Sequence, residues 1–241
     1  MGDGVNYSQL ESIALQGSDV YAAGYEMNPS KVLVAMYWKN GVSVPITDGS
    51  QPSYCYGLVV TKNDVHTAGM VLLPAGHSAA VYWKNTTAYP LTPATSFASA
   101  NDITLSGNDI YITGYEQTLP NKAAVKYWKN GAAYPLTDGR YSATGLDIEV
   151  AGGDVYVAGM EENAKGVKVA KYWRNGSPTI LSDGVFTSYA MSIKVLGSDV
   201  YVAGIEYMSG GIASVKYWKN GAKISITDGG YEAWTYGMDI R

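Results

Sequence analysis

The sequence is poor in cysteine, histidine, phenylalanine and charged residues. Its 241 residues include one cysteine, two histidines and two phenylalanines, and only 16% of them are charged. The single cysteine, Cys55, excludes an intrachain disulfide, and no His, Cys and Asp cluster has the spacing of zinc ligands. No apolar run approaches the ~18 residues of a membrane-spanning helix. The first four residues, Met-Gly-Asp-Gly, do not have the pattern of a signal peptide.

Basic residues are equally sparse. The formal net charge is −4, and no run of Lys or Arg exceeds two residues. Nucleic-acid-binding proteins neutralise phosphates with a basic stripe, which this chain does not have. We therefore expect no nucleic-acid partner, no membrane partner and no cofactor. The compartment stays open, with a secreted or cell-surface location favoured.

Tryptophan, by contrast, recurs at a constant interval of 45 residues. Each of these tryptophans follows a tyrosine and precedes Lys or Arg and then Asn. The five residues are Trp38, Trp83, Trp128, Trp173 and Trp218. A fixed period of ~40–50 residues is typical of a propeller or a solenoid.

Each 45-residue copy contains four short segments with alternating apolar residues. In the fourth copy they span 144–150, 154–159, 167–173 and 179–182. Hairpin-turn signals separate them, including Gly-Gly-Asp at 152–154 and Asn-Gly at 175–176. No segment has helical periodicity over ten residues, and the hairpins argue against a solenoid of parallel strands.

We therefore predict an all-β fold, a five-bladed β-propeller with four-stranded antiparallel blades. It forms a single domain over 1–241, with repeats at approximately 5–49, 50–94, 95–139, 140–184 and 185–229. The first segment of the repeat occurs six times, because 230–241 matches the start of the chain. One terminal inner strand is therefore redundant, and it could support strand-exchanged self-association.

Two recurring elements, GSDVYVAG and YWKNG, carry a resemblance over nearly the whole chain. With them the repeat resembles bacterial β-propeller repeat proteins, which implies a fold and no activity. In blade size and number the chain is similar to tachylectin-type five-bladed lectins, although the blade motif differs. Five-bladed enzymes that cleave furanosides are a third comparison. Their acidic residues occur singly on different blades, whereas the acidic residues of this chain recur at the same position in several copies.

A side chain that recurs in every copy is more typical of a packing residue than of a catalytic or binding residue. The five tryptophans could stack on sugars, but a residue present in every blade is more typical of packing between blades. The repeated turn aspartates, such as Asp19 and Asp154, are typical of side chains that cap a turn. A column of glutamates could instead bind a ligand from one face, namely Glu26, Glu116, Glu161 and Glu206. Equivalent environments make these glutamates poor candidates for an acid/base pair.

Variation between copies indicates where a ligand would bind. The loops before the first segment and after the second change from copy to copy, whereas the opposite turns are constant. Aromatic residues at the changing end are candidate stacking platforms, namely Tyr54, Tyr56, Tyr189, Trp234 and Tyr236. We predict a non-enzymatic module that binds a glycan or an extended peptide. The alternatives are a structural or interaction segment of a larger surface protein without a small ligand, and a glycoside hydrolase.

Overall fold

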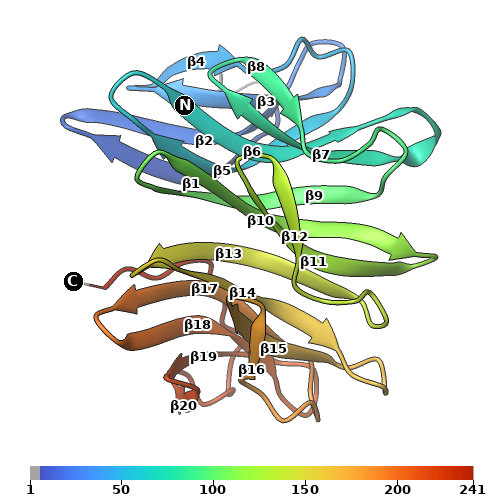
Figure 1. The fold of residues 1–241 in the computed structure, drawn as a ribbon, viewed down its shortest axis with the longest axis vertical. Helices are drawn as coiled ribbons and strands as arrows, with labels where there is room; N and C mark the ends of the chain where they lie inside the picture. The colour runs from blue at the N-terminus through green and yellow to red at the C-terminus, as the bar shows by residue number, and fades with distance from the viewer. Residues whose placement is uncertain (1–5, 241) are drawn as a thin grey trace. The chain divides into compact units, whose positions relative to one another are not determined.

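The computed structural model describes residues 6–240 and contains five antiparallel sheets of four strands (Figure 1). Sheet 1 has β1 (Ser8–Gln16), β2 (Asp19–Met27), β3 (Leu33–Lys39) and β4 (Val42–Pro45). Sheet 2 has β5 (Ser53–Val60), β6 (Val65–Leu72), β7 (Ser78–Lys84) and β8 (Thr87–Pro90), with a short 3₁₀ turn at Pro74–Gly76. Sheet 3 has β9 (Ala98–Ser106), β10 (Asp109–Leu119), β11 (Lys122–Lys129) and β12 (Ala132–Pro135). Sheet 4 has β13 (Ala143–Ala151), β14 (Asp154–Glu162), β15 (Lys168–Arg174) and β16 (Ser177–Ile180). Sheet 5 has β17 (Ser188–Leu196), β18 (Asp199–Tyr207), β19 (Ala213–Lys219) and β20 (Ala222–Ser225).

Strands follow one another in chain order within every sheet. Five four-stranded sheets confirm the prediction of an all-β, five-bladed β-propeller. Residues 231–240 form no strand, so the redundant copy of the inner strand is the C-terminal one. Residue 241 lies outside the described residues. No helix within 6–240 is long and apolar enough to cross a membrane.

The described chain divides into two compact units. Unit 1 contains 6–116 and 128–133, and unit 2 contains 117–127 and 134–240. Sheets 1 and 2 lie in unit 1, sheets 4 and 5 lie in unit 2, and the strands of sheet 3 are shared. The grouping of all repeats into a single domain over 1–241 stays a prediction.

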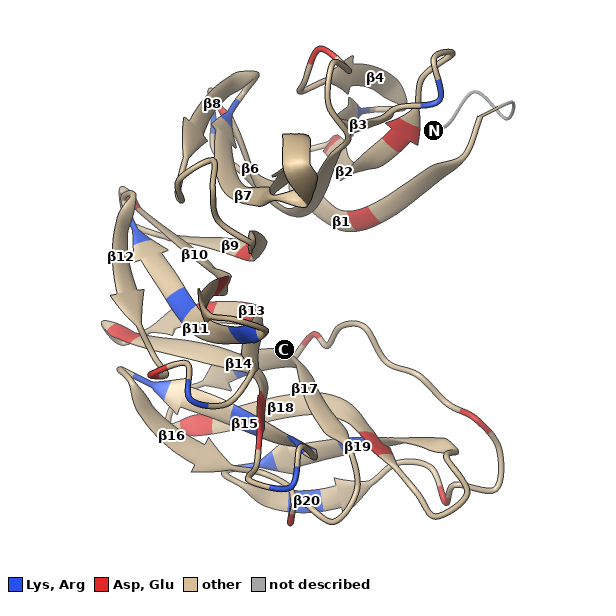
Figure 2. Ribbon diagram, turned by 90° about the vertical axis from the view of Figure 1, so that its right-hand side faces the viewer, with Lys and Arg blue, Asp and Glu red and all other residues tan. Residues whose placement is uncertain are grey.

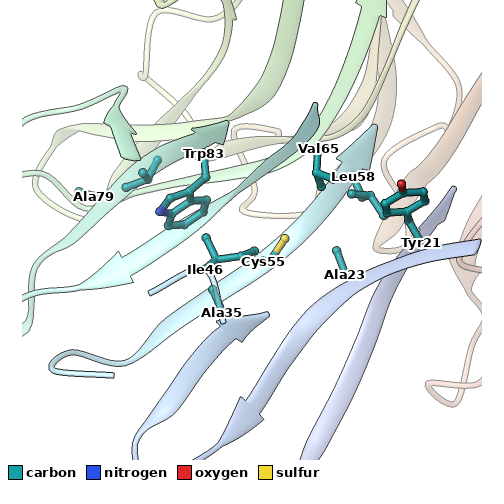
Figure 3. Close-up of a cluster of buried hydrophobic side chains, with 10 residues drawn as sticks. Tyr21, Ala23, Ala35, Ile46, Cys55, Leu58, Val65, Ala79 and Trp83 are labelled. Carbon is teal, nitrogen blue, oxygen red and sulfur yellow. The ribbon is translucent and has the colours of Figure 1, made fainter. Parts of the chain in front are cut away.

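The first strand of a sheet packs across the face of the sheet before it. In unit 1, β5 packs on β1, β2 and β3, and β9 packs on β5, β6 and β7. In unit 2, β17 packs on β13, β14 and β15 in the same way. Figure 3 shows one such core, in which Tyr21 and Ala23 of sheet 1 lie with Leu58 and Trp83 of sheet 2. Small alanines and the buried Cys55 complete this cluster.

Each of the five repeated tryptophans is buried, with an exposed fraction of at most 2%. An indole ring with no accessible face cannot stack on a sugar, so the interpretation as packing residues is confirmed. Each indole lies in the third strand of its sheet and removes a large apolar area from water. The 45-residue period therefore reports the spacing of core residues.

The constant turns are held by a clip of three side chains that recurs in each sheet. In sheet 3, Asn130 accepts a bond from the Ile110 amide at 2.9 Å and donates to Asp109 at 2.8 Å. Lys129 pairs with the second oxygen of Asp109 at 2.8 Å. These bonds hold the pKa of Asp109 below its usual value, the bond from Lys129 contributing most. The turn aspartates are therefore structural, but their carboxylates bond to the side chains of the clip and do not cap their own turn as predicted.

A β-bulge interrupts the inner strand of every sheet at the same repeat position. In sheet 4, Gly145 faces Gly159 and Asp147 faces Ala158, which leaves Leu146 without a partner. A Cβ atom on Gly159 would lie 2.0 Å from the carbonyl oxygen of Thr144. The glycine that ends the GSDVYVAG element therefore permits the bulge, because another residue would collide with the backbone.

We expect Gly159→Ala to destabilise the protein by about 1–3 kcal/mol, because the new methyl group must push two strands apart. Chemical denaturation monitored by tryptophan fluorescence measures this loss. Gly237→Ala is the matched control, since no atom lies within 4 Å of the added Cβ. Equal stability of the two variants would contradict the close approach described for the bulge.

A second pair of variants separates backbone strain from hydrogen bonding in the clip. Asn130 has a φ of 51°, in the region that glycine tolerates best. Asn130→Ala loses the side-chain bonds and keeps a strained backbone, whereas Asn130→Gly loses the bonds alone. We expect the alanine variant to have the lower melting temperature, by an amount equivalent to about 1 kcal/mol or more. Equal melting temperatures would show that the strain is absent.

Candidate active site

The bulged residue differs in chemistry from sheet to sheet, although the bulge itself is constant. The five bulged residues are Glu11, Tyr56, Asn101, Leu146 and Met191. A bulge leaves its extra residue out of the strand pairing and redirects that side chain, and bulges are frequent beside active sites. In this chain a common backbone device therefore presents polar side chains in sheets 1 to 3 and apolar ones in sheets 4 and 5.

Tyrosines of sheets 1 and 2 form a row beside the first two bulges. The ring of Tyr25 meets Tyr54 edge-on at 4.9 Å, and Tyr54 stacks on Tyr56 at 6.1 Å. Tyr7 extends the row, with its ring 6.3 Å from that of Tyr25. We call these four residues the tyrosine row. Flat rings with hydroxyl groups at their edges are suited to contact with a sugar.

Glu11 is tied to this row through Gln9, which lies two residues earlier on β1. The Gln9 amide donates to Glu11 Oε1 at 2.7 Å. Its oxygen accepts bonds from the hydroxyls of Tyr7 and Tyr25, at 2.7 Å and 2.8 Å. The carboxyl of Glu11 therefore has a defined position although the side chain remains accessible to solvent.

The surroundings of Glu11 favour its protonated form. Loss of surrounding water raises the pKa of Glu11, and hydrogen bonds involving Tyr25 and Gln9 offset only part of that effect. Burial, with a further contribution from the charge of Glu11, also raises the pKa of Tyr25 and of Tyr56. The site therefore combines a carboxyl group whose pKa is raised with phenol groups whose pKa values are also raised.

The predicted aromatic platforms fall into two groups. Tyr54 and Tyr56 belong to the tyrosine row in unit 1. Tyr189 and Trp234 lie in unit 2, where Lys168 Nζ donates to the Tyr189 hydroxyl at 2.7 Å and Trp234 meets Tyr207 edge-on at 6.2 Å. Tyr236 is 80% exposed.

A surface hollow of about 540 Å³ adjoins this second group. Its lining includes Lys168, Phe186, Tyr189, Tyr207 and Met208. Two tyrosine rings in this lining offer apolar surface, but the hydroxyl of Tyr189 is already bonded to Lys168. Among the described residues that line the hollow there is no carboxylate.

Three of the four glutamates of the predicted column, Glu116, Glu161 and Glu206, are bonded to other side chains of the protein. Glu161 pairs with Lys171 at 2.6 Å, and Glu206 is buried and pairs with Lys223 at 3.0 Å. Glu116 accepts a bond from Ser96 at 2.8 Å, and Glu26 lies near the end of β2 opposite Ser8. Within residues 6–240, no three His, Cys, Asp or Glu side chains are grouped to hold a metal ion.

Sequence reasoning missed Glu11, Gln9 and Tyr25 as members of one site. Only aromatic residues at the changing end of the repeat were named as candidates, and Glu11 was not among them. A glutamate at this position in the first repeat alone was the available signal. The bulge that redirects this position is a backbone feature, and the repeat pattern did not reveal it.

No family model and no curated protein matches this sequence. Among solved structures, the Pyrococcus horikoshii acylaminoacyl peptidase is similar over 97% of this chain, with a TM-score of 0.53 and 11% identity. The match spans 48% of that peptidase chain, so this chain covers about half of its length. At this identity the likeness is one of fold.

Two further structures have TM-scores below 0.5. A GH43_12 retrieved from a capybara gut metagenome has a TM-score of 0.41 and 14% identity over 94% of this chain and 58% of its own. A glycoside hydrolase has a TM-score of 0.44 and 6% identity over 95% of this chain and 92% of its own. The fold comparison therefore rests on the peptidase.

The prediction of a non-enzymatic module that binds a glycan or an extended peptide was wrong, because the similar structure with a TM-score above 0.5 is that of a peptidase. The error has a physical reason. The sequence argument judged the repeated glutamates, whose equivalent environments cannot divide the roles of acid and base. Glu11 is not repeated, and its environment differs from that of every glutamate in the column.

Replacing Glu11 with Gln should change stability in a pH-dependent way. A carboxyl whose pKa is raised on folding binds more protons in the folded state, so its ionisation destabilises the protein as pH rises above the unfolded value of 4.5. We expect Glu11→Gln to melt at a higher temperature than the parent at pH 7. The two proteins should melt together below about pH 4.

Thermal unfolding across this pH range, with Glu149→Gln as the control, measures the effect. Glu149 lies on the inner strand β13 and pairs with Lys194 at 2.9 Å. A Glu11→Gln variant that is less stable than the parent at pH 7 would contradict the raised pKa.

Proposed function

We propose that this chain is a glycoside hydrolase in which Glu11 is the proton donor and the accessible rings of the tyrosine row, Tyr7, Tyr54 and Tyr56, bind the sugar, whereas the buried Tyr25 supports them. The observation that carries the proposal is a single, positioned and solvent-accessible carboxyl group beside stacked tyrosines. Glu11 is held by Gln9 at 2.7 Å, next to rings that lie 4.9 Å and 6.1 Å apart. We also propose that the chain belongs to the bacterial β-propeller repeat proteins, because it contains their GSDVYVAG and YWKNG elements.

Glycoside hydrolysis needs a protonated carboxyl group to assist departure of the leaving group. The raised pKa of Glu11 supports this role, because a general acid must carry its proton near the working pH. The same loss of surrounding water that raises this pKa also strengthens charge interactions at the site.

A second carboxylate must activate water or form the glycosyl intermediate. Glu11 and Asp102 are the two acidic residues on the described inner strands of unit 1, which are β1, β5 and β9. Asp102 follows the bulged Asn101 directly. We assign the second role to Asp102, because Glu11 occupies a bulge whereas Asp102 pairs with Thr113 in the ladder, and different settings allow one carboxyl to hold a proton while the other is ionised.

The test is a panel of chromogenic furanosides and pyranosides with the 241-residue chain. Glu11→Gln should lower kcat by about 10²–10⁴-fold on any substrate that is cleaved, which is the usual contribution of a general acid. Asp102→Asn should also lower kcat. Because the proton donor must be protonated, activity should decline as pH rises through the pKa of Glu11.

Glu149→Gln is the matched control and should retain the activity of the parent, since Glu149 is an inner-strand glutamate whose partner is Lys194. Full activity in Glu11→Gln would reject Glu11 as the donor. An inactive but folded parent over the whole panel would reject the hydrolase. The structural or interaction segment of a larger surface protein would then be the better account.

A further inference from the structure

The surface hollow beside Tyr189 is formed by sheets 4 and 5 alone, and its lining residues all belong to unit 2. Sheet 4 contributes the loop before β15 and the start of that strand. Sheet 5 contributes the start of β17 and the loop after β18. No atom lies within 4 Å of a Cβ added to the glycines of the lining, which are Gly166, Gly210 and Gly211. The two loops therefore leave open space between them.

The basic residue of the lining occurs in one copy of the repeat only. Lys168 occupies a position that is Leu33, Ser78, Ala123 or Ala213 in the other copies. Positions that pack the core are constant by comparison, as the repeated tryptophans are. The fold of a sheet therefore does not require a lysine at this position.

The loop after β18 also departs from the turn chemistry of the other copies. In sheets 1 and 4 the side chains of Asn28 and Asn163 accept bonds from the amides of Val32 and Val167, at 2.9 Å and 3.1 Å. Met208 stands at this position in sheet 5, and its sulfur is a weak acceptor at best. The loop has therefore lost a polar turn bond and has gained an apolar side chain in the lining of the hollow.

Lys168 differs from the other basic residues of its strand in having no acidic partner among the described residues. β15 contains Lys168, Lys171 and Arg174, and basic residues are blue in Figure 2. Lys171 pairs with Glu161, and Arg174 pairs with Asp154. One positive charge of β15 is therefore left for a ligand.

The acidic residue across the ladder does not neutralise this charge. Glu162 lies opposite Lys168, but its carboxylate pairs with Lys122 at 3.1 Å. Lys168 Nζ instead donates to the hydroxyl of Tyr189 at 2.7 Å and lies 5.0 Å from the centroid of that ring. These distances place the ammonium group at the hydroxyl end of the ring. An ammonium group has three donors, so two remain for a ligand.

Elsewhere in the chain a carboxylate completes each arrangement of a cation beside a tyrosine ring. Four other cations lie 5.2 Å, 5.2 Å, 5.5 Å and 5.1 Å from a tyrosine centroid, and each also pairs with a turn aspartate. These cations are Lys39, Lys129, Arg174 and Lys219, in that order. In the hollow the ring and the cation are present without the carboxylate. A carboxylate on a ligand would complete the same arrangement.

The aromatic rings of the hollow favour a sugar over a simple anion. Phe186 is 40% exposed, and the rings of Tyr189 and Tyr207 also belong to the lining. Trp234 meets Tyr207 edge-on at 6.2 Å and supports it. Such rings suit the apolar face of a pyranose. A phosphate ion or an acidic peptide would use the charge of Lys168 and leave these rings without a matching surface.

We propose that this hollow binds a uronic acid residue of an acidic polysaccharide. The carboxylate of the sugar pairs with Lys168, and its pyranose ring lies against Phe186 and the two tyrosines. The inference goes beyond the proposed hydrolysis, because the hollow belongs to unit 2 whereas Glu11 belongs to unit 1. This site retains an acidic polymer by binding alone.

Isothermal titration calorimetry with oligosaccharides of galacturonate, glucuronate and mannuronate tests the site. Each acid is compared with its methyl ester, which has the same sugar ring without the charge. We expect at least one acid to bind, and its ester to bind about 10-fold more weakly, because a hydrogen bond between charged groups is lost. Affinity for the acid should also fall as the salt concentration rises from about 0.05 M to about 0.3 M, because salt screens exposed charges.

Replacing the lysine separates its charge from its place in the fold. Lys168→Gln should weaken binding of the acid by about 10-fold and remove the preference for the acid over the ester. Lys165→Gln is the matched control. Lys165 is an exposed lysine three residues earlier in the chain, and it is not part of the lining. Its replacement should leave the affinity unchanged.

A second pair of variants tests the aromatic surface. Phe186→Ala should weaken binding by about 3-fold or more, because a ring that contacts the sugar is removed. Phe97→Ala is the control, since Phe97 is the other of the two phenylalanines, is 43% exposed and lies in unit 1. Circular dichroism confirms that each variant is folded.

Absence of binding by every uronate, or equal affinity for acid and ester, would overturn the proposal. So would an unchanged affinity in folded Lys168→Gln. A hexa-aspartate peptide that binds as tightly as the uronates would also overturn it, because the site would then recognise charge alone. These readouts do not depend on enzymatic activity. A chain that binds uronates and cleaves no glycoside would reject the proposed function alone.

Discussion

The contact between a glycine and a carbonyl oxygen shapes the inner strand of each sheet. Where the second strand has Gly24, Gly69, Gly114, Gly159 or Gly204, a Cβ atom would lie about 2 Å from the neighbouring carbonyl oxygen. This approach accompanies the bulge, and the bulge decides which residue leaves the strand pairing. The candidate site depends on this geometry, because Glu11 occupies the bulge of sheet 1. Gly24, which recurs as a packing residue in every sheet, thus helps to position Glu11.

A repeated scaffold can hold a single site because its constant and variable positions have different physical tasks. The tryptophans are buried, and the Asp, Asn and Lys or Arg of the clip satisfy one another at the turns, so these positions tolerate little change. The bulged position lies at a shift of the ladder register and carries a different side chain in each sheet. Glu11 therefore stands in an environment that no other repeat reproduces. Acid/base catalysis requires such an asymmetry between carboxyl groups.

The sequence by itself determined the fold class, the strand order within each sheet, the turns and the structural role of the tryptophans. These features follow from local periodicity and from turn residues such as Asn130, whose left-handed backbone a short polar side chain tolerates. It also indicated Tyr54 and Tyr56, because exposed aromatics in a variable column stand out. Only the tertiary structure decided that Glu11 occupies a bulge and is held by Gln9, and that Glu161 and Glu206 are paired with lysines. Those facts depend on contacts between strands and on the water displaced around a carboxyl group, neither of which a one-dimensional pattern records.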